Sequence, residues 1–142
     1  MNVIDPMGAG LVDSLPRPGG NATGFTLFEY SLSAKWDELL KEVAPNVTRA
    51  AVLRDAAFAS GIGQFAVIQS VATSLGLETS VVNVRDPGEI ERTVAAFARS
   101  ANGSLIVTAS ALAGSVHCKL IITLAARHKL PVYYERFFIT AA

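Results

Sequence analysis

Three short apolar runs of the chain each end in, or are followed by, residues whose side chains could hold a small solute. There are seven such residues. The runs are 50–53, 105–107 and 131–134, and each has the composition of a buried strand. Parallel strands present their carboxyl ends at one edge of a sheet, so the residues after them are expected to share that edge. The candidate ligand-binding residues are Asp55, Phe58, Ser60, Thr108, Ser110, Tyr134 and Glu135.

The chemistry of this set fits a zwitterion such as an amino acid. Ser60 is expected near the start of a helix, where free backbone N–H groups can receive a carboxylate. Asp55 and Glu135 could receive an amine, and Phe58 and Tyr134 could stack on an aromatic or aliphatic group. Structural explanations stay open as well: Ser60 as a helix N-cap, Asp55 as a turn residue and Phe58 as part of the core. The three loops as a group are a stronger prediction than any single member.

A glycine-containing stretch, Gly61-Ile62-Gly63-Gln64-Phe65-Ala66, formally matches the dinucleotide-binding pattern, with Asp86 further along the chain. That pattern needs its first glycine in a tight turn directly after a strand, whereas here a loop separates Leu53 from Gly61. Asp86 is also explained as the cap of the next helix. We therefore expect no cofactor, and a nucleotide-binding or flavodoxin-like regulatory domain is the alternative function. A magnesium-dependent receiver is disfavoured because Thr108-Ala109-Ser110 offers no acid.

Catalytic and metal-binding patterns are absent from the sequence. His117 and Cys118 are neighbours on a predicted helix, where consecutive side chains point about 100° apart and cannot form a catalytic dyad. No group of His, Cys, Asp and Glu has the spacing of metal ligands. These observations predict a binding protein that is not an enzyme and carries no metal.

The elements that must position the candidate residues alternate between strands and helices. Strands are predicted at 50–53, 79–84, 105–107 and 131–134, with apolar residues at helical spacing between them. Asp86-Pro87-Gly88-Glu89 has the composition of a helix start. This alternation implies parallel strands with right-handed crossovers, and so a three-layer α/β/α, flavodoxin-like domain with about four strands. An earlier helix is predicted to turn one face inward, formed by Trp36, Leu39, Leu40 and Val43.

Charge and composition exclude several classes of partner. The 142 residues include 12 Lys or Arg and 12 Asp or Glu, and this zero net charge argues against nucleic acid or an anionic membrane. Although 51% of residues are hydrophobic, no stretch reaches the ~18–20 apolar residues of a membrane helix. The single Cys118 cannot form an internal disulfide. The first residues do not resemble a signal peptide, so the chain as it stands is expected to stay in the cytoplasm.

Four segments point to a known family. They are Asp5–Val12, Pro18–Phe25, Lys35–Pro45 and Ala125–Pro131. Together they closely resemble the ABC-transporter substrate-binding family that includes tryptophan- and tyrosine-binding proteins. The resemblance runs essentially from end to end, and the Asp-Pro to Pro-Gly-Gly-Asn passage is its most specific part. It implies one lobe of a periplasmic-binding-protein fold that binds a small-molecule solute in a cleft between two lobes.

The same resemblance implies a domain organisation and a set of partners. Residues 1–30 would be a remnant of the first lobe plus the crossover, with Asp5 able to face the cleft, and residues 31–142 would be the second α/β lobe. The full-length parent would be periplasmic or extracytoplasmic and would deliver its solute to an ABC permease. A short helix near Leu11 to Leu15 and a strand near 23–28 would lack neighbours. We therefore expect a homo-oligomer formed through this N-terminal segment.

Overall fold

A parallel sheet of four strands lies at the centre of the computed structural model, which describes residues 5–24, 30–112 and 117–134. The strands lie in the order β2-β1-β3-β4, and every neighbouring pair is parallel. The sequence predicts all four strands to within two residues of their observed ends. Their bounds are β1 (Arg49–Arg54), β2 (Glu78–Asn83), β3 (Gly103–Val107) and β4 (Val132–Tyr134).

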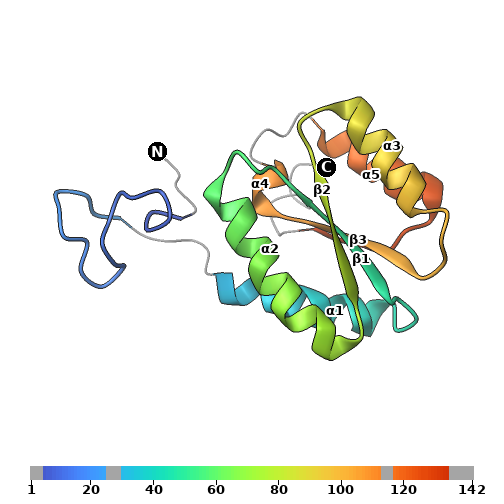
Figure 1. Cartoon of the computed structure of the whole chain (residues 1–142), viewed down its shortest axis with the longest axis horizontal. Coiled ribbons are helices and arrows are strands. Elements are labelled where there is room, and N and C mark those ends of the chain that lie inside the picture. Colours follow the sequence, from blue (N-terminus) through green and yellow to red (C-terminus); the bar gives the residue numbers. More distant parts are fainter. Residues whose placement is uncertain (1–4, 25–29, 113–116, 135–142) are drawn as a thin grey trace.

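Helices cover both faces of this sheet, which confirms the predicted three-layer α/β/α fold (Figure 1). The helical elements are η1 (Tyr30–Ser33), α1 (Ala34–Val43), α2 (Ala59–Ala72), η2 (Thr73–Leu75), α3 (Pro87–Phe97), α4 (Ala109–Leu112) and α5 (Cys118–His128). Helices α1 and α2 pack on one face, and α3 and α5 pack on the other. The sheet is therefore shielded on both sides, and its loops at the strand ends remain the surfaces available to a ligand.

The central strand β1 explains why the sequence has a continuous apolar run instead of an alternating one. Ala50 and Val52 pack against α1 and α2, whereas Ala51 and Leu53 pack against α3 and α5. All four side chains are fully buried. The fully buried positions of β1 and β3 are apolar or glycine except Ser104, whose hydroxyl donates to the Arg49 carbonyl oxygen at 3.0 Å, and these two strands form the rigid support of their loops.

The predicted start of α3 is confirmed. Asp86 is the N-cap, its Oδ2 accepts a hydrogen bond of 2.8 Å from the Glu89 backbone N–H, and Pro87 takes the first helical position. The carboxylate thereby satisfies one of the N–H groups that a helix start leaves without a partner. This cap accounts for Asp86 without any contact to a nucleotide.

The predicted inward face of α1 is partly wrong. Trp36 and Leu40 are buried as expected, but Leu39 is 41% exposed and Val43 is 83% exposed. Asp37 takes their place and is fully buried. Trp36 stacks on the Tyr133 ring of β4 at 5.4 Å, and the buried face of α1 includes Asp37 instead of Leu39 and Val43.

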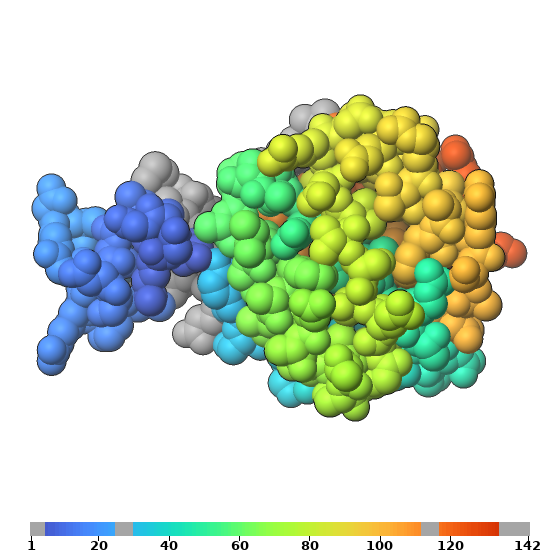
Figure 2. Space-filling view, viewed as in Figure 1, coloured from blue at the N-terminus to red at the C-terminus, as the bar shows by residue number. Residues whose placement is uncertain are grey.

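The N-terminal segment 5–24 extends away from the α/β domain (Figures 1 and 2). The predicted short helix near Leu11 to Leu15 is wrong, because residues 5–24 contain turns and no helix or strand. Ser14 is the physical reason: its hydroxyl donates to the Arg17 carbonyl and accepts from the Arg17 N–H, which replaces helical hydrogen bonds with a turn. The predicted strand near 23–28 lies mostly outside the described residues.

None of the described helices has the length and apolar character to span a membrane.

Candidate functional site

The loops that follow β1 and β3 meet at the carboxyl edge of the sheet. The chain runs from β1 to the neighbouring edge strand β2 and then returns to the other side of β1 as β3, so the strand order reverses between β1 and β3. This reversal is the position at which open α/β sheets bind ligands. A hydrogen bond of 3.1 Å from the Asp55 backbone N–H to Ser110 Oγ joins the two loops there.

Two of the predicted ligand-binding hydroxyls hold these loops together. Thr108 Oγ1 donates to the Leu53 carbonyl oxygen at 2.8 Å and lies 2.9 Å from Ser110 Oγ. Thr108 is fully buried and Ser110 is 2% exposed, so neither presents appreciable surface to a solute in this structure. Their hydroxyls make a continuous link from the end of β1 to the start of α4.

The beginning of α2 lies on top of this link. Phe58 is the N-cap residue, with an extended backbone and no side-chain capping bond, and Ser60 is the second helical residue. The structural alternatives of Ser60 as N-cap and Phe58 as core are therefore wrong, since Phe58 is 46% exposed. Ser60 is 6% exposed. The Gly61 N–H donates to the Phe58 carbonyl oxygen at 3.0 Å, so the N–H groups of Ala59 and Ser60 are the ones that this helix start leaves able to bind an anion.

Asp55 is the turn residue that one interpretation of the sequence predicts. Its Oδ1 accepts a 2.8 Å hydrogen bond from the Ala57 N–H and lies 3.8 Å from Arg85 Nε in an ion pair. The Arg85 side chain is 63% exposed, so this pair is solvated and contributes little to stability. The Asp55 carboxylate therefore stabilises the turn that precedes α2. Because its ion-pair partner Arg85 is exposed, the carboxylate remains accessible from solvent.

Tyr134 ends β4 and pairs in register with Val107 of β3, which places its backbone at the same carboxyl edge. The structure describes the backbone of Tyr134 but not its side chain, and Glu135 lies outside the described residues. Their predicted roles in ligand binding stay predictions.

Gln64 is an important residue of this region that is not among the candidate residues predicted from the sequence. It lies on the inward face of α2, is fully buried, and its Oε1 accepts a 3.1 Å hydrogen bond from the Ala109 N–H at the start of α4. A polar residue on the otherwise small and apolar face formed by Gly61, Ile68 and Ala72 is a signal that could have identified it. Gln64 fixes α2 to the loop that follows β3.

The two glycines of the dinucleotide-like pattern both have packing roles. A Cβ added at Gly61 would lie 2.7 Å from the Asp55 carbonyl oxygen and would also overlap Ser110 Oγ. At Gly63 an added Cβ would lie 2.6 Å from Tyr30 Cζ. Close approach of neighbouring groups, and not contact with a phosphate, explains why glycine occupies these positions.

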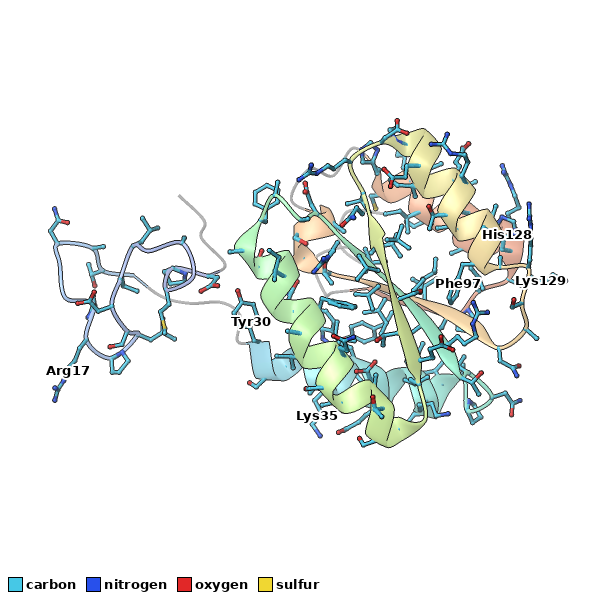
Figure 3. All side chains as sticks on the ribbon, viewed as in Figure 1. Arg17, Tyr30, Lys35, Phe97, His128 and Lys129 are labelled. Carbon is cyan, nitrogen blue, oxygen red and sulfur yellow. The ribbon has the colours of Figure 1, made fainter. Side chains whose placement is uncertain are left out.

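Tyr30 connects the N-terminal segment to the α/β domain. Its hydroxyl donates a hydrogen bond to Asp5 Oδ2, while its ring lies beside α2 at Gly63 (Figure 3). Burial, and then the hydrogen bond and the charge of Asp5, raise the pKa of Tyr30 well above its usual value. Asp5 also accepts a 2.7 Å hydrogen bond from the Gly8 N–H, so its carboxylate has two partners within the chain.

No cluster of three or more His, Cys, Asp or Glu residues that could hold a metal ion occurs in the part of the chain that the structure describes.

The model of one protein family, described as ABC transporter substrate binding protein, matches residues 1–137. The chain belongs to this family. A search of curated proteins found no match.

Three solved structures share the fold of this chain and are each about twice its length. The ABC domain from Streptococcus pneumonia in complex with L-Trp has a TM-score of 0.82 and 24% identity, over 99% of this chain and 47% of that one. A conserved domain protein from Vibrio cholerae has a TM-score of 0.74 and 25% identity, over 92% and 43%. The ligand-free, open substrate-binding protein with adhesive properties from Clostridium difficile has a TM-score of 0.64 and 26% identity, over 90% and 42%. The family member therefore spans slightly less than half the length of these structures.

Proposed function

We propose that this chain forms one lobe of the solute-binding component of an ABC importer, and that it is a binding protein and not an enzyme. The main support is the start of α2, which lies at the strand-order reversal with Phe58 exposed and Ser60 at its second position. The family assignment and the relative that binds L-Trp support the same interpretation. In this proposal residues 1–30 belong to the first lobe and the crossover, and residues 31–142 form the second lobe.

The solute that we propose is an amphipathic amino acid. The N–H groups at the start of α2 and the Ser60 hydroxyl would receive its carboxylate. Phe58 and Ile62 are one helical turn apart, 46% and 52% exposed, and would contact its side chain. Asp55 would receive the amine, together with Tyr134 and Glu135 in their predicted roles. Thr108 and Ser110 would act by holding the two loops in place.

A titration of the chain with L-Trp, L-Tyr, L-Phe, L-Leu and glucose, followed by ligand-observed NMR, tests this function. We expect weak but saturable binding of the amphipathic amino acids and none of glucose, because one lobe supplies only half of a closed cleft. The alternative nucleotide-binding function is tested by adding NAD, FAD and ATP to the same series. Binding of a nucleotide, or of no amino acid, would contradict the proposal.

Replacing Ser60 tests the carboxylate contact. Ser60→Ala is expected to raise the dissociation constant of the best amino acid by about tenfold or more, because a hydrogen bond to a charged group is worth roughly 1.5–3 kcal/mol. Ser70→Ala is the matched control on the same helix, since the exposed Ser70 hydroxyl donates to the Val67 carbonyl oxygen far from the loops. NMR titration of both variants measures the effect, and equal affinities would remove Ser60 from the site.

We also propose that two copies of the chain associate through the N-terminal segment. Met7, Leu11 and Leu15 are 49%, 45% and 47% exposed, and their burial against a second copy would be favourable. Light scattering should give a mass of twice the 15.0 kDa of one chain. The double variant Leu11→Ser/Leu15→Ser should give the mass of a single chain. A monomer at high protein concentration would contradict this association.

The remaining partners follow from the proposed transport function. The full-length parent would act outside the cytoplasm and deliver its solute to an ABC permease. Neither nucleic acid nor a cofactor has a part in this function.

A further inference from the structure

Helix α1 contains a buried carboxylate that the proposed solute site does not use. Asp37 is fully buried, and it is the one acidic residue buried in the described part of the chain. Neither of its carboxylate oxygens has a hydrogen-bond partner there. Ser33, one helical turn earlier, is also fully buried, and its Oγ likewise has no partner. An isolated charge in such a place costs several kcal/mol, so the group should be neutral.

The elements packed against α1 provide no charge to balance Asp37. They are η1, α2, η2 and β4. Helix α2 and η2 contain no titratable side chain. In η1 the hydroxyl of Tyr30 donates to Asp5, and in β4 the ring of Tyr133 stacks on Trp36. The side chain of Tyr134 lies outside the described part of the structure.

The cations closest in sequence or beneath α1 contact residues other than Asp37, although Arg49 Nη1 and Arg54 Nε are buried without hydrogen-bond partners. Lys35 lies at the surface (Figure 3). It pairs with Glu38 at 2.7 Å, and both side chains are exposed. Lys41 donates to the Val47 carbonyl oxygen at 2.8 Å. In β1, the guanidinium of Arg49 lies over the Phe97 ring at 4.4 Å, and that of Arg54 lies over the Phe65 ring at 5.0 Å. Glu42, the other charged residue of α1, is exposed and acidic. No described cation is therefore paired with Asp37.

We propose that Asp37 is a proton-binding site, which holds one proton while α1 is packed on the sheet and releases it to neutral water when α1 detaches. Burial raises the pKa of Asp37 from its ordinary 3.8 to about 7, in agreement with this geometry. A protonated carboxyl group is uncharged and can donate a hydrogen bond, so the buried position is tolerated in that form.

The sign of the pH dependence follows from which state binds the proton. Between the ordinary pKa of 3.8 and the folded value of about 7, the folded chain holds a proton that the unfolded chain has lost. The unfolding equilibrium constant should then rise by about tenfold for each unit of pH. Above the folded pKa both states are deprotonated, and the dependence levels off. The lobe should thus be more stable in mild acid than at neutral pH.

Urea unfolding of the chain from pH 5 to pH 8 tests this proposal. The unfolding constant of the natural sequence should rise roughly a hundredfold across that interval. Asp37→Asn keeps the shape but cannot ionise, so its profile should lose this rise and the variant should be the more stable protein at pH 8. Glu38→Gln, an exposed carboxylate on the same helix, is the matched control and should retain the rise.

Two results would overturn the proposal. One is an unfolding constant of the natural sequence that does not rise between pH 5 and pH 8. The other is an equal rise of the unfolding constant in Asp37→Asn. If Asp37→Asn does not fold, carbon-13 NMR of the natural chain decides the question, because the Asp37 carboxyl signal should titrate near pH 7 instead of near pH 4.

Discussion

Gly61→Val is expected to lower the free energy of unfolding by about 3 kcal/mol, because the position is already in close contact on its side-chain face. An added Cβ would lie 2.7 Å from the Asp55 carbonyl oxygen and would overlap Ser110 Oγ. The carbonyl belongs to the backbone, so it cannot turn aside as a flexible side chain would. The loop after β1 must move away from α2, and solute binding should be lost along with stability. Urea unfolding and NMR titration measure the two effects.

Gly20→Val is the matched control for this substitution. A Cβ at Gly20 meets nothing within 4 Å, so the free energy of unfolding should change by less than about 0.5 kcal/mol. Adding Ser110→Ala to Gly61→Val should recover only part of the loss, because the contact with the Asp55 carbonyl remains. A Gly61→Val protein as stable as the Gly20→Val control would show that the loops do not pack as described.

Gln64→Ala is expected to destabilise the chain by about 3 kcal/mol, in two ways. The Ala109 N–H loses its acceptor at the start of α4 and remains buried without one. The side chain is fully buried, so its removal also leaves a cavity between α2 and the sheet. Part of this cost is offset, because Gln64 Nε2 is itself buried without a partner in the described structure. Thermal unfolding should show a midpoint lower by about 10 °C.

Gln69→Ala removes the same side chain from the exposed face of the same helix and should leave the midpoint almost unchanged. Proton exchange at the Ala109 N–H gives a local readout, since this amide should become much less protected in Gln64→Ala and not in Gln69→Ala. Equal midpoints for the two variants would mean that Gln64 does not join α2 to the loop after β3.

Local patterns in the sequence were sufficient to predict the layers of the fold. The apolar run 50–53 identifies a strand covered on both faces, and Asp86-Pro87 identifies a helix start, because each depends on neighbours within a few residues. The prediction of a short helix near Leu11 is wrong, and the reason is again local. Ser14 competes for backbone hydrogen bonds, and apolar spacing carries no information about that competition.

The details of the candidate site depend on contacts between distant segments, which spacing cannot supply. Asp55 and Ser110 are far apart in the sequence but joined by a hydrogen bond. The same is true of Gln64 and Ala109. Asp37 lies on the buried face of α1 together with Trp36, which stacks on Tyr133 of β4, whereas apolar periodicity alone placed Leu39 and Val43 on that face. The sequence thus predicted that the loops after β1 and β3 meet, but not which of their side chains would join them, and the predicted part of the loop after β4 stays a prediction.

The central claim is that a small solute binds where α2 begins, at the carboxyl edge of the sheet. Nitrogen-15 NMR of the labelled chain during titration with L-Trp tests it most directly, because weak binding still shifts amide signals. The account predicts that the largest shifts fall on Asp55 to Gly61 and on Ser110. Largest shifts at the opposite edge, on Thr48 and Asn102, which are hydrogen-bonded to each other there, or no shifts with any amino acid, would contradict it.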